Sequence, residues 1–439
     1  MELQVEKLIY GGDGLARLPA DEHGRGKTVF LPYVIPGEQV EATIIESRSG
    51  FARARLNQII TASPERVAPQ CPYFGRCGGC QYQHIEYATQ LRFKAEILLE
   101  TLRRTAKLEL RKDIQLYASE PWGYRNRTRV RVEHEPAFAL GYFQANSHKL
   151  LAMETCPISS PLINTAISAV WRLGRAGQVP PAVHGMQFFA DHDDSKLLVE
   201  VYVRSETRER DCELFAAEME RLNTVVGVSV FVTSPVEDET RQLAPLSSLP
   251  NEPALANGAS YLTYHAARRN YQVSGGSFFQ TNRFLMEDLV KVALEDAKGG
   301  VALDLYAGVG LFTLPLAASF REVTAVEASP HAAGDLKRNA PANVKVVRAT
   351  TESFLEQAAH GLRPEFILLD PPRAGLGEKA TKALCRTSAS RVTYVSCDPA
   401  TLSRDLRLLL ESGFTVEQAH LFDLFPQTAH METVLHLVR

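Results

Sequence analysis

A cysteine at a predicted strand-to-helix turn is the residue best suited to covalent chemistry in this 439-residue chain. Cys397 lies where an apolar run ends at Ser396 and a helical pattern begins after Pro399. Asp398 is a favourable N-cap residue, and proline is favoured at the first helical position. The sequence therefore predicts that Cys397 lies beside the positive end of a helix dipole, where thiolate is favoured over thiol. A buried structural role is commoner for an isolated cysteine, so the rest of the chain must decide.

Carboxylates lie at the ends of further apolar runs in the last third of the chain. Glu327 ends the run 323–326, Asp370 follows the run 366–369, and Glu432 precedes the last apolar run. The carboxyl ends of parallel strands meet at one edge of an open α/β sheet, where ligands bind. We therefore expect these three carboxylates and Cys397 to share one site.

A strand, a glycine-rich turn and a helix are predicted for residues 301–314. Asp304 precedes the turn, and Glu327 ends the following β-type run, where an acid can accept hydrogen bonds from ribose hydroxyls. A nicotinamide dinucleotide is the rival ligand for such a unit. Thr313 stands where the third glycine of a dinucleotide motif would fall, and this favours S-adenosylmethionine.

Three cysteines are crowded into ten residues. Five residues separate Cys71 from Cys77 and two separate Cys77 from Cys80, while Cys156, followed by proline, is the best candidate for a fourth ligand. Pairs with two intervening residues are common in zinc sites. A remote fourth cysteine before proline favours an iron–sulfur cluster. The spacing predicts a metal centre and leaves both metals open.

An alternating basic run is predicted to form a strand at residues 124–132. Side chains alternate across a strand, so its arginines would share one face. Like charges on one face repel, and we interpret the run as a phosphate-binding face rather than a merely solvated one. The four residues are Arg125, Arg127, Arg129 and Arg131.

Short β-type runs separated by glycine and proline turns fill residues 1–63 and predict a small five-stranded barrel. Arg48, Arg53 and Arg55 flank Phe51. Cations interleaved with an aromatic ring are typical of single-stranded nucleic-acid binders. A solvated barrel face explains this stretch equally well.

Composition places the chain among ordinary globular proteins, with 45% hydrophobic and 23% charged residues. The formal net charge of −3 gives no global sign of a nucleic-acid partner. Seven cysteines, an odd number, do not suggest a disulfide framework, and Cys212 and Cys385 fall in helical patterns. Since no apolar run has membrane-spanning length and the first residues lack a signal-peptide pattern, we expect a cytoplasmic protein without a membrane or an obligate protein partner.

Taken together, these motifs resemble the RNA 5-methyluridine methyltransferase family over nearly the whole chain. The most specific matches are the segments 277–282, 370–373, 396–402 and 425–432. The resemblance implies a multi-domain α/β protein. Residues 1–63 would be a TRAM-like, OB-like barrel that binds RNA, and residues 64–270 a central α+β domain with the cysteine cluster and a helix near 85–108 that packs on the C-terminal domain. Residues 271–439 would be a Rossmann-like class I methyltransferase domain.

The resemblance also implies roles for individual residues. Cys397 would add to C6 of uracil and Glu432 would remove the C5 proton, with His430 as the local rival base. The residues implied for S-adenosylmethionine are Gln280, Tyr306, Glu327, Thr350 and Asp370. The residues implied for a [4Fe-4S] cluster are Cys71, Cys77, Cys80 and Cys156. Leu311 and Asp398 stand where related enzymes often have asparagine.

Several alternatives remain open. Transfer RNA is the rival of the favoured ribosomal RNA, and cytosine C5 or a base amino group are rival acceptors. Cytosine methylation would use a thiol in a Pro-Cys pair, which is absent at Cys397. A further alternative is an RNA-binding iron–sulfur protein without catalytic activity. The presence of both Cys397 and Glu432 argues against it.

Overall fold

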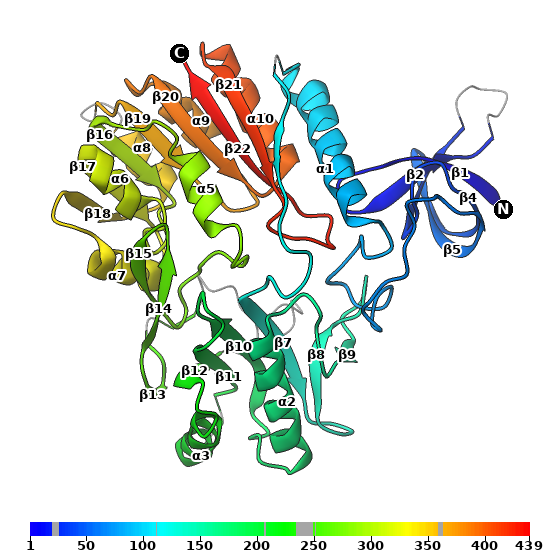
Figure 1. Cartoon of the computed structure of the whole chain (residues 1–439), viewed down its shortest axis with the longest axis horizontal. Helices are drawn as coiled ribbons and strands as arrows, with labels where there is room; N and C mark the ends of the chain where they lie inside the picture. The colour runs from blue at the N-terminus through cyan, green and yellow to red at the C-terminus, as the bar shows by residue number, and fades with distance from the viewer. Residues whose placement is uncertain (20–25, 111, 206–207, 234–248, 251, 359–362) are drawn as a thin grey trace.

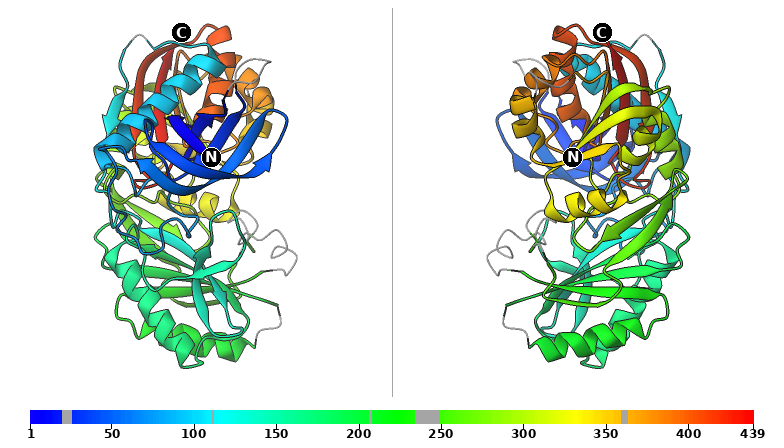
Figure 2. Two further views of the ribbon diagram at one scale, coloured as in Figure 1. Left: turned by 90° about the vertical axis from the view of Figure 1, so that its right-hand side faces the viewer. Right: turned by 90° about the vertical axis from the view of Figure 1, so that its left-hand side faces the viewer.

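The computed structural model describes the chain except residues 20–25, 111, 206–207, 234–248, 251 and 359–362. A closed barrel comes first, followed by a central seven-stranded sheet and a C-terminal eight-stranded sheet (Figure 1). The central sheet lies at one end of the molecule, and the barrel lies beside the C-terminal sheet at the other (Figure 2). This agrees with the predicted multi-domain α/β fold.

Alternating burial explains why the first strands close into a barrel. Leu3 and Val5 of the first strand are buried between exposed neighbours, as expected for a strand with one face in a core. Five strands are hydrogen-bonded in the order β1-β2-β3-β5-β4, which confirms the predicted strand number. Their bounds are β1 (Glu2–Leu8), β2 (Asp13–Arg17), β3 (Thr28–Pro32), β4 (Gln39–Ser47) and β5 (Phe51–Thr61).

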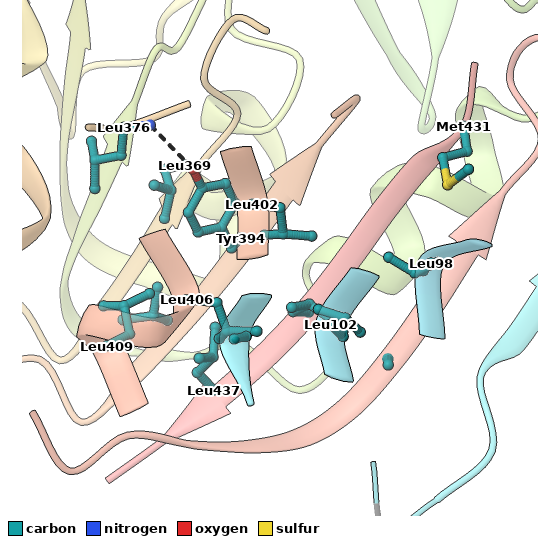
Figure 3. Close-up of a cluster of buried hydrophobic side chains, with 14 of the residues drawn as sticks. Leu98, Leu102, Leu369, Leu376, Tyr394, Leu402, Leu406, Leu409, Met431 and Leu437 are labelled. Atoms are coloured by element: carbon teal, nitrogen blue, oxygen red, sulfur yellow. Dashed lines mark hydrogen bonds between the residues drawn. The ribbon is translucent and has the colours of Figure 1, made fainter. Parts of the chain in front are cut away.

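Helix α1 (Tyr87–Thr101) joins the N-terminal half of the chain to the C-terminal domain. The Glu86 side chain caps it by accepting a hydrogen bond from the Thr89 N–H. Its apolar stripe continues into a π-helical turn at Leu102–Ala106, and Leu98 and Leu102 pack into the same core as Leu402 (Figure 3). The helix therefore shares a hydrophobic core with residues from the last third of the chain.

The central sheet has the order β13-β12-β11-β10-β7-β8-β9. Strands β10 and β11 are buried at every position, which is typical of strands covered on both faces. The bounds of the strands are β7 (Arg127–Glu133), β8 (Ala139–Phe143), β9 (Leu150–Ala152), β10 (Val183–Ala190), β11 (Leu197–Val203), β12 (Val225–Val232) and β13 (Leu255–Gly258), and those of the helices are α2 (Pro161–Arg175) and α3 (Glu209–Glu220).

The structure corrects the interpretation of the basic run as a phosphate-binding face. Strand β7 begins only at Arg127, whose side chain is 5% exposed and forms a buried ion pair with Glu200 at 3.0 Å. Arg125 precedes the strand and lines a cavity with the cysteines. The prediction of a phosphate-binding face was therefore wrong for these two arginines, because a long-range carboxylate and the cysteine segment surround them. Arg129 and Arg131 are half-buried and stack over Tyr202 and Phe143.

The C-terminal sheet has the order β18-β17-β16-β19-β20-β22-β21-β6. Strands β16 to β20 are parallel, and β22 runs antiparallel between β20 and β21. Strand order diverges at β16, so the carboxyl ends of β16 and β19 form the edge where such sheets bind ligands. The bounds are β6 (Gln115–Tyr117), β16 (Gly299–Leu305), β17 (Phe320–Glu327), β18 (Val344–Arg348), β19 (Phe366–Leu369), β20 (Arg391–Ser396), β21 (Thr415–Phe422) and β22 (Glu432–Val438).

Helices cover both faces of this sheet because each strand buries side chains on both sides. In β16, Leu303 and Leu305 belong to one core with α1, α8, α9 and α10, whereas Ala302 belongs to a second core with α5 and α6. The bounds are α5 (Met286–Ala293), α6 (Thr313–Ser319), α7 (Pro330–Asn339), α8 (Thr351–Ala358), α9 (Glu378–Cys385) and α10 (Pro399–Glu411). Cys212 in α3 and Cys385 in α9 lie in helices as predicted.

A two-stranded hairpin, β14 (Tyr261–Ala266) and β15 (Arg269–Ser274), links the central and C-terminal sheets. The expected domain boundary between residues 270 and 271 falls inside β15, and the hairpin's buried side chains share a core with α5 and α6. Across the described residues, no helix is both long and apolar enough to cross a membrane.

Candidate active site and cysteine pocket

Cys397 lies at the turn that the sequence predicted. Strand β20 ends at Ser396, and Asp398 caps α10 by accepting hydrogen bonds from the N–H groups of Ala400 and Thr401 at 3.0 and 2.9 Å. Pro399 is the first helical residue. A strand end followed at once by a capped helix fixes the backbone of Cys397.

The prediction that Cys397 is a thiolate is wrong. Burial above all, and then the carboxylates of Glu432 and Asp370, raise the pKa of Cys397 to about 12 against the opposing charge of the Arg373 guanidinium. The helix terminus does not overcome these effects, because desolvation and two nearby acids both disfavour a second negative charge. In the free protein Cys397 is a thiol at neutral pH.

The two carboxylates come from the neighbouring strand ends, as predicted. Glu432 begins β22, is 3% exposed, and has one carboxylate oxygen, Oε1, without a hydrogen bond among the described residues. Burial and the nearby Asp370 hold the pKa of Glu432 well above its usual range. Asp370 follows β19, and burial raises its pKa to about 7, against the effect of a hydrogen bond donated by Gln280 Nε2 at 3.1 Å. The structure thus brings Cys397, Asp370, Glu432 and Gln280 into one site.

Arg373 and His430 form the basic side of this site. The Nη2 atom of Arg373 lies 3.3 Å from Nε2 of His430. Burial above all, and then the Arg373 charge, lowers the pKa of His430 to about 4. His430 is therefore a neutral imidazole at pH 7 and a weaker base than an ionised Glu432, whose pKa is raised. Arg373 stood within a matched segment without an assigned role, and the structure gives it an electrostatic one.

The predicted cofactor residues line the edge formed by β16 and β17. Glu327 accepts hydrogen bonds from the N–H groups of Gly308 and Ser329 at 2.8 and 2.7 Å. A carboxylate has about four acceptor positions, so two remain for ribose hydroxyls. Tyr306 holds the turn in a left-handed conformation with a φ of 61°. Asp304 is fully buried against the Thr313 hydroxyl, and burial raises the pKa of Asp304 to about 7.

Thr350 follows Ala349, whose N–H donates to the Glu327 carbonyl at 3.2 Å. Its exposed side chain accepts a hydrogen bond from the Ser353 N–H at 3.2 Å. It thereby caps the first turn of α8. A local structural role accounts for this threonine, and its contact with a cofactor stays a prediction.

A network that the sequence analysis missed holds the loop before Glu432. The Gln90 side chain donates to Gln427 Oε1 at 3.0 Å and accepts from the Gln427 N–H at 3.0 Å. One turn further along α1, Lys94 forms an ion pair of 2.6 Å with Asp423. All four side chains are buried, and both members of the ion pair are completely inaccessible. A glutamine and a lysine within the apolar stripe of a helix were the signal in the sequence.

The barrel also reaches the site. Tyr10, between β1 and β2, donates a hydrogen bond from its hydroxyl to the Cys397 carbonyl at 3.3 Å. Gly12 packs so closely on Gln81 and Ala429 that a Cβ there would lie 2.7 and 3.3 Å from their side chains. The N-terminal barrel therefore contacts both loops that carry the catalytic candidates.

Cys71, Cys77, Cys80 and Cys156 line a single cavity of about 240 Å³, so the structure brings the predicted fourth cysteine to the other three. All four thiols are free. Burial above all, together with the neighbouring Cys156 and Cys77, raises the pKa of Cys80 to about 12. Burial also raises the pKa values of Cys71 and Cys77. Arg125 also lines the cavity and carries a positive charge. Its buried Nε has no hydrogen bond among the described residues.

Comparison with known proteins adds an independent line of information. Residues 259–439 match the family described as tRNA (uracil-5-)-methyltransferase, and residues 1–56 match the TRAM domain. An RNA methyltransferase from Halalkalibacterium halodurans is 31% identical over 99% of this chain and 96% of its own. The 23S rRNA (uracil(1939)-C(5))-methyltransferase of Pectobacterium atrosepticum is 33% identical, over 99% of this chain and 92% of its own.

A solved structure has the same fold. The tRNA (uracil-54, C5)-methyltransferase of Pyrococcus abyssi, in complex with S-adenosyl-L-homocysteine, superposes with a TM-score of 0.77 over 99% of both chains at 22% identity. The likeness extends from the barrel to the last strand, so all parts of the architecture are shared.

Proposed function

This chain belongs to the S-adenosylmethionine-dependent RNA uracil-C5 methyltransferases, and we propose that it methylates C5 of one uridine in ribosomal RNA through a covalent adduct on Cys397. Ribosomal RNA is favoured because a relative named for 23S rRNA is 33% identical over nearly the full length. The relative named for transfer RNA is 22% identical. The observation that carries the chemistry is the meeting of a thiol, Cys397, with two carboxylates, Asp370 and Glu432, at one end of the sheet.

The reaction requires a nucleophile because uracil C5 is itself a poor one. S-adenosylmethionine would supply the methyl group and leave as S-adenosylhomocysteine. Cys397 loses its proton to a carboxylate of the site or to water and adds to C6, so that an S–C6 bond forms and C5 gains carbanion character. Once C5 carries the methyl group, a base removes its remaining proton and the S–C6 bond breaks, which restores the ring and the thiolate.

Glu432 is the proposed base for this last step. Its Oε1 atom has no partner among the described residues and is free to accept a proton. Its raised pKa makes the ionised form a stronger base than an ordinary carboxylate. His430, with a pKa lowered to about 4, is the weaker candidate, and we assign it a polar role beside Arg373.

We propose that the cysteine pocket holds an iron–sulfur cluster rather than zinc. A tetrahedral zinc with bonds of about 2.3 Å holds its sulfur ligands about 3.8 Å apart. Among the described residues, the cysteines do not form a group of three or more whose ligand atoms all lie within 4.8 Å, whereas another set of residues does. Four thiolates around a [4Fe-4S] core carry net negative charge, which the neighbouring Arg125 would offset. Cys71, Cys77, Cys80 and Cys156 would hold the cluster in a structural role.

The barrel and the central domain would present RNA to the methyltransferase domain, in the cytoplasm. TRAM membership supports the barrel as an RNA-binding surface. Its basic face is partly neutralised, because Arg53 pairs with Asp13 and Arg48 with Glu46. Attack on C6 requires a flipped or single-stranded uridine, since a stacked base hides its faces.

Trapping with 5-fluorouridine tests the proposal. The protein is mixed with S-adenosylmethionine and 5-fluorouridine-containing RNA and run on a denaturing gel. Fluorine cannot leave as a proton, so wild type should form a covalent complex and Cys397→Ala should not. Sequencing the trapped RNA names the substrate, and a transfer RNA would correct the ribosomal assignment. No adduct from protein that binds the cofactor would overturn the covalent mechanism.

The metal assignment has its own test. Anaerobically purified protein should be brown and contain about four iron and four sulfide per chain. Colourless protein with stoichiometric zinc bound through cysteine would overturn the cluster.

A further inference from the structure

A second group of possible metal ligands lies away from both the catalytic edge and the cysteine pocket. His420 of β21 and His436 of β22 are diagonal neighbours, since His420 pairs with Val434 and His436 with Gln418. Their ring centroids lie 5.4 Å apart with an interplanar angle of 87°. Glu295, just after α5, joins them, and one ligand atom from each of the three residues lies within 4.8 Å of the others.

The histidines are buried, and the carboxylate is the exposed member. His420 is 1% and His436 is 7% exposed, so their rings are held by the packing of β21, β22 and α5. Burial lowers the pKa values of both, for His436 to about 4. The neutral imidazole is the form that binds metals.

Each histidine has a neighbour that orients its ring. Thr393 Oγ1 lies 3.0 Å from Nδ1 of His436. The other nitrogen, Nε2, is buried and makes no hydrogen bond within the described residues, although the Val292 carbonyl lies close enough to raise the pKa of the ring. For His420, Tyr117 Oη lies 3.4 Å from Nδ1 and Gln418 Oε1 lies 3.2 Å from Nε2. Polar partners on the non-ligating nitrogen are the usual support for a metal-bound imidazole.

The surroundings favour a cation. A cavity of about 330 Å³ opens beside His436, and three carboxylates line it, those of Glu295, Asp296 and Glu417. Arg391 also lines this cavity, but it donates to the backbone carbonyls of Asp296 and Glu295 at 3.1 and 3.3 Å. Within the described chain, Glu295 has no ion-pair partner, so its carboxylate remains available to a ligand.

We propose that Glu295, His420 and His436 form a binding site for a divalent transition-metal ion, best matched by zinc. Two imidazoles and one carboxylate are a common zinc ligand set, with bonds of about 2.0–2.2 Å and a fourth position for water or another oxygen. The exposed Glu295 side chain can close the remaining distance, and Gln418 Oε1 is near enough to replace water.

The site would connect the end of α5 to the last two strands. It lies on β22 four residues from Glu432, but nothing in the proposed reaction uses it. A metal that binds the folded chain and not the unfolded one stabilises the fold by mass action. The expected role is therefore to stabilise the packing of α5 on strands β21 and β22, independently of methyl transfer.

Titration of the intact protein with Co²⁺ and Zn²⁺ tests this inference. Protein with its cysteine pocket filled should bind one additional Co²⁺ and show visible d–d absorption without a sulfur-to-cobalt charge-transfer band. His436→Gln should weaken binding more than about 100-fold, because even outer partners of a metal ligand change affinity about 10- to 100-fold. Glu295→Gln, at an exposed position that tolerates substitution, should weaken it in the same direction.

The matched control is His265→Gln, which removes an exposed histidine of the β14–β15 hairpin and should bind Co²⁺ like wild type. Zn²⁺ should raise the melting temperature of wild type and of this control but not that of Glu295→Gln. Equal binding by wild type and both site variants, a thiolate band, or no additional bound ion would each overturn the proposal.

Discussion

The Cys397 site and the cysteine pocket contain the same functional group, which is partly buried at Cys397 and buried at Cys80. The pKa of Cys397 and that of Cys80 are both raised to about 12, and burial is the largest cause in each case. The neighbours differ. Cys397 lies beside Glu432 and Asp370, whereas Cys80 lies beside other thiols and near Arg125. Burial alone therefore does not tell a nucleophile from a ligand; the adjacent charged groups do.

Carboxylates beside a lone thiol can accept protons during a reaction, but they disfavour a resting thiolate. Several neighbouring thiols favour the binding of a metal core, because its positive charge compensates several thiolates at once. The comparison predicts that substitutions at the first site change rates and intermediates, while substitutions at the second change metal content.

The largest expected effect is that of Cys397→Ala. Methyl transfer should fall at least about 10⁴-fold, because loss of a covalent nucleophile removes the whole reaction route. Iron content should stay at the wild-type level. The measurement is incorporation of labelled methyl groups into RNA alongside iron analysis, and Cys156→Ala should give the reverse pattern, with iron lost and the nucleophile present. Similar losses of both properties in the two variants would remove the distinction between the sites.

Glu432→Gln should lower turnover about 10²- to 10⁴-fold, the usual contribution of a general base. The methylated RNA should remain attached to Cys397, because elimination needs the C5 proton to leave. A denaturing gel with ordinary RNA would reveal this accumulated adduct. Wild-type turnover in this variant would transfer the role of base to another group, such as His430.

Gln90→Met should produce a weaker form of the same defect. Gln90 connects α1 to Gln427 through two hydrogen bonds of 3.0 Å, and its loss leaves buried polar groups unpaired at a cost of about 1–3 kcal/mol. We expect kcat to fall about 10-fold with an unchanged KM for S-adenosylmethionine and partial adduct accumulation, because the loop before Glu432 is loosened.

Arg92→Met is the control for Gln90→Met. Arg92 is half-exposed on the same helix and pairs with Glu65, away from the Gln427 loop. It should keep wild-type kinetics and show no adduct. A Gln90→Met protein with full kcat would mean that the network stabilises the fold without positioning Glu432.

The smallest expected effect concerns pH. Since the pKa of Cys397 is raised to about 12, its thiolate fraction, and so its alkylation rate, should rise about 10-fold per pH unit between pH 7 and 10. Asp370→Asn removes a negative charge and should lower this pKa, which would speed alkylation at pH 8 about 3- to 10-fold. Mass spectrometry of the peptide containing Cys397 measures the rate. A plateau near neutral pH would show that the thiol ionises more easily than its surroundings indicate.

Local features of the fold were predictable from the sequence. The strand-to-helix turn at Cys397 follows from Asp398 and Pro399, which act on backbone groups within three residues of themselves. The barrel and α1 follow from alternating and helical patterns of apolar residues, since such patterns are set by neighbouring positions. The acids at the carboxyl ends of strands follow from the general geometry of parallel sheets.

Tertiary structure decided the protonation state of Cys397, the burial of Arg127 and the connection of Gln90 to Gln427. Each depends on partners far away in the chain: Gln90 and Gln427 are 337 residues apart, and Arg127 and Glu200 are 73 apart. The sequence pattern alone indicates that Arg127 binds phosphate, whereas the structure shows that it pairs with the buried Glu200. The sequence by itself determined which groups stand at the ends of strands and helices, whereas only the folded chain decided their charge, because desolvation and long-range pairing do not exist before the chain is packed.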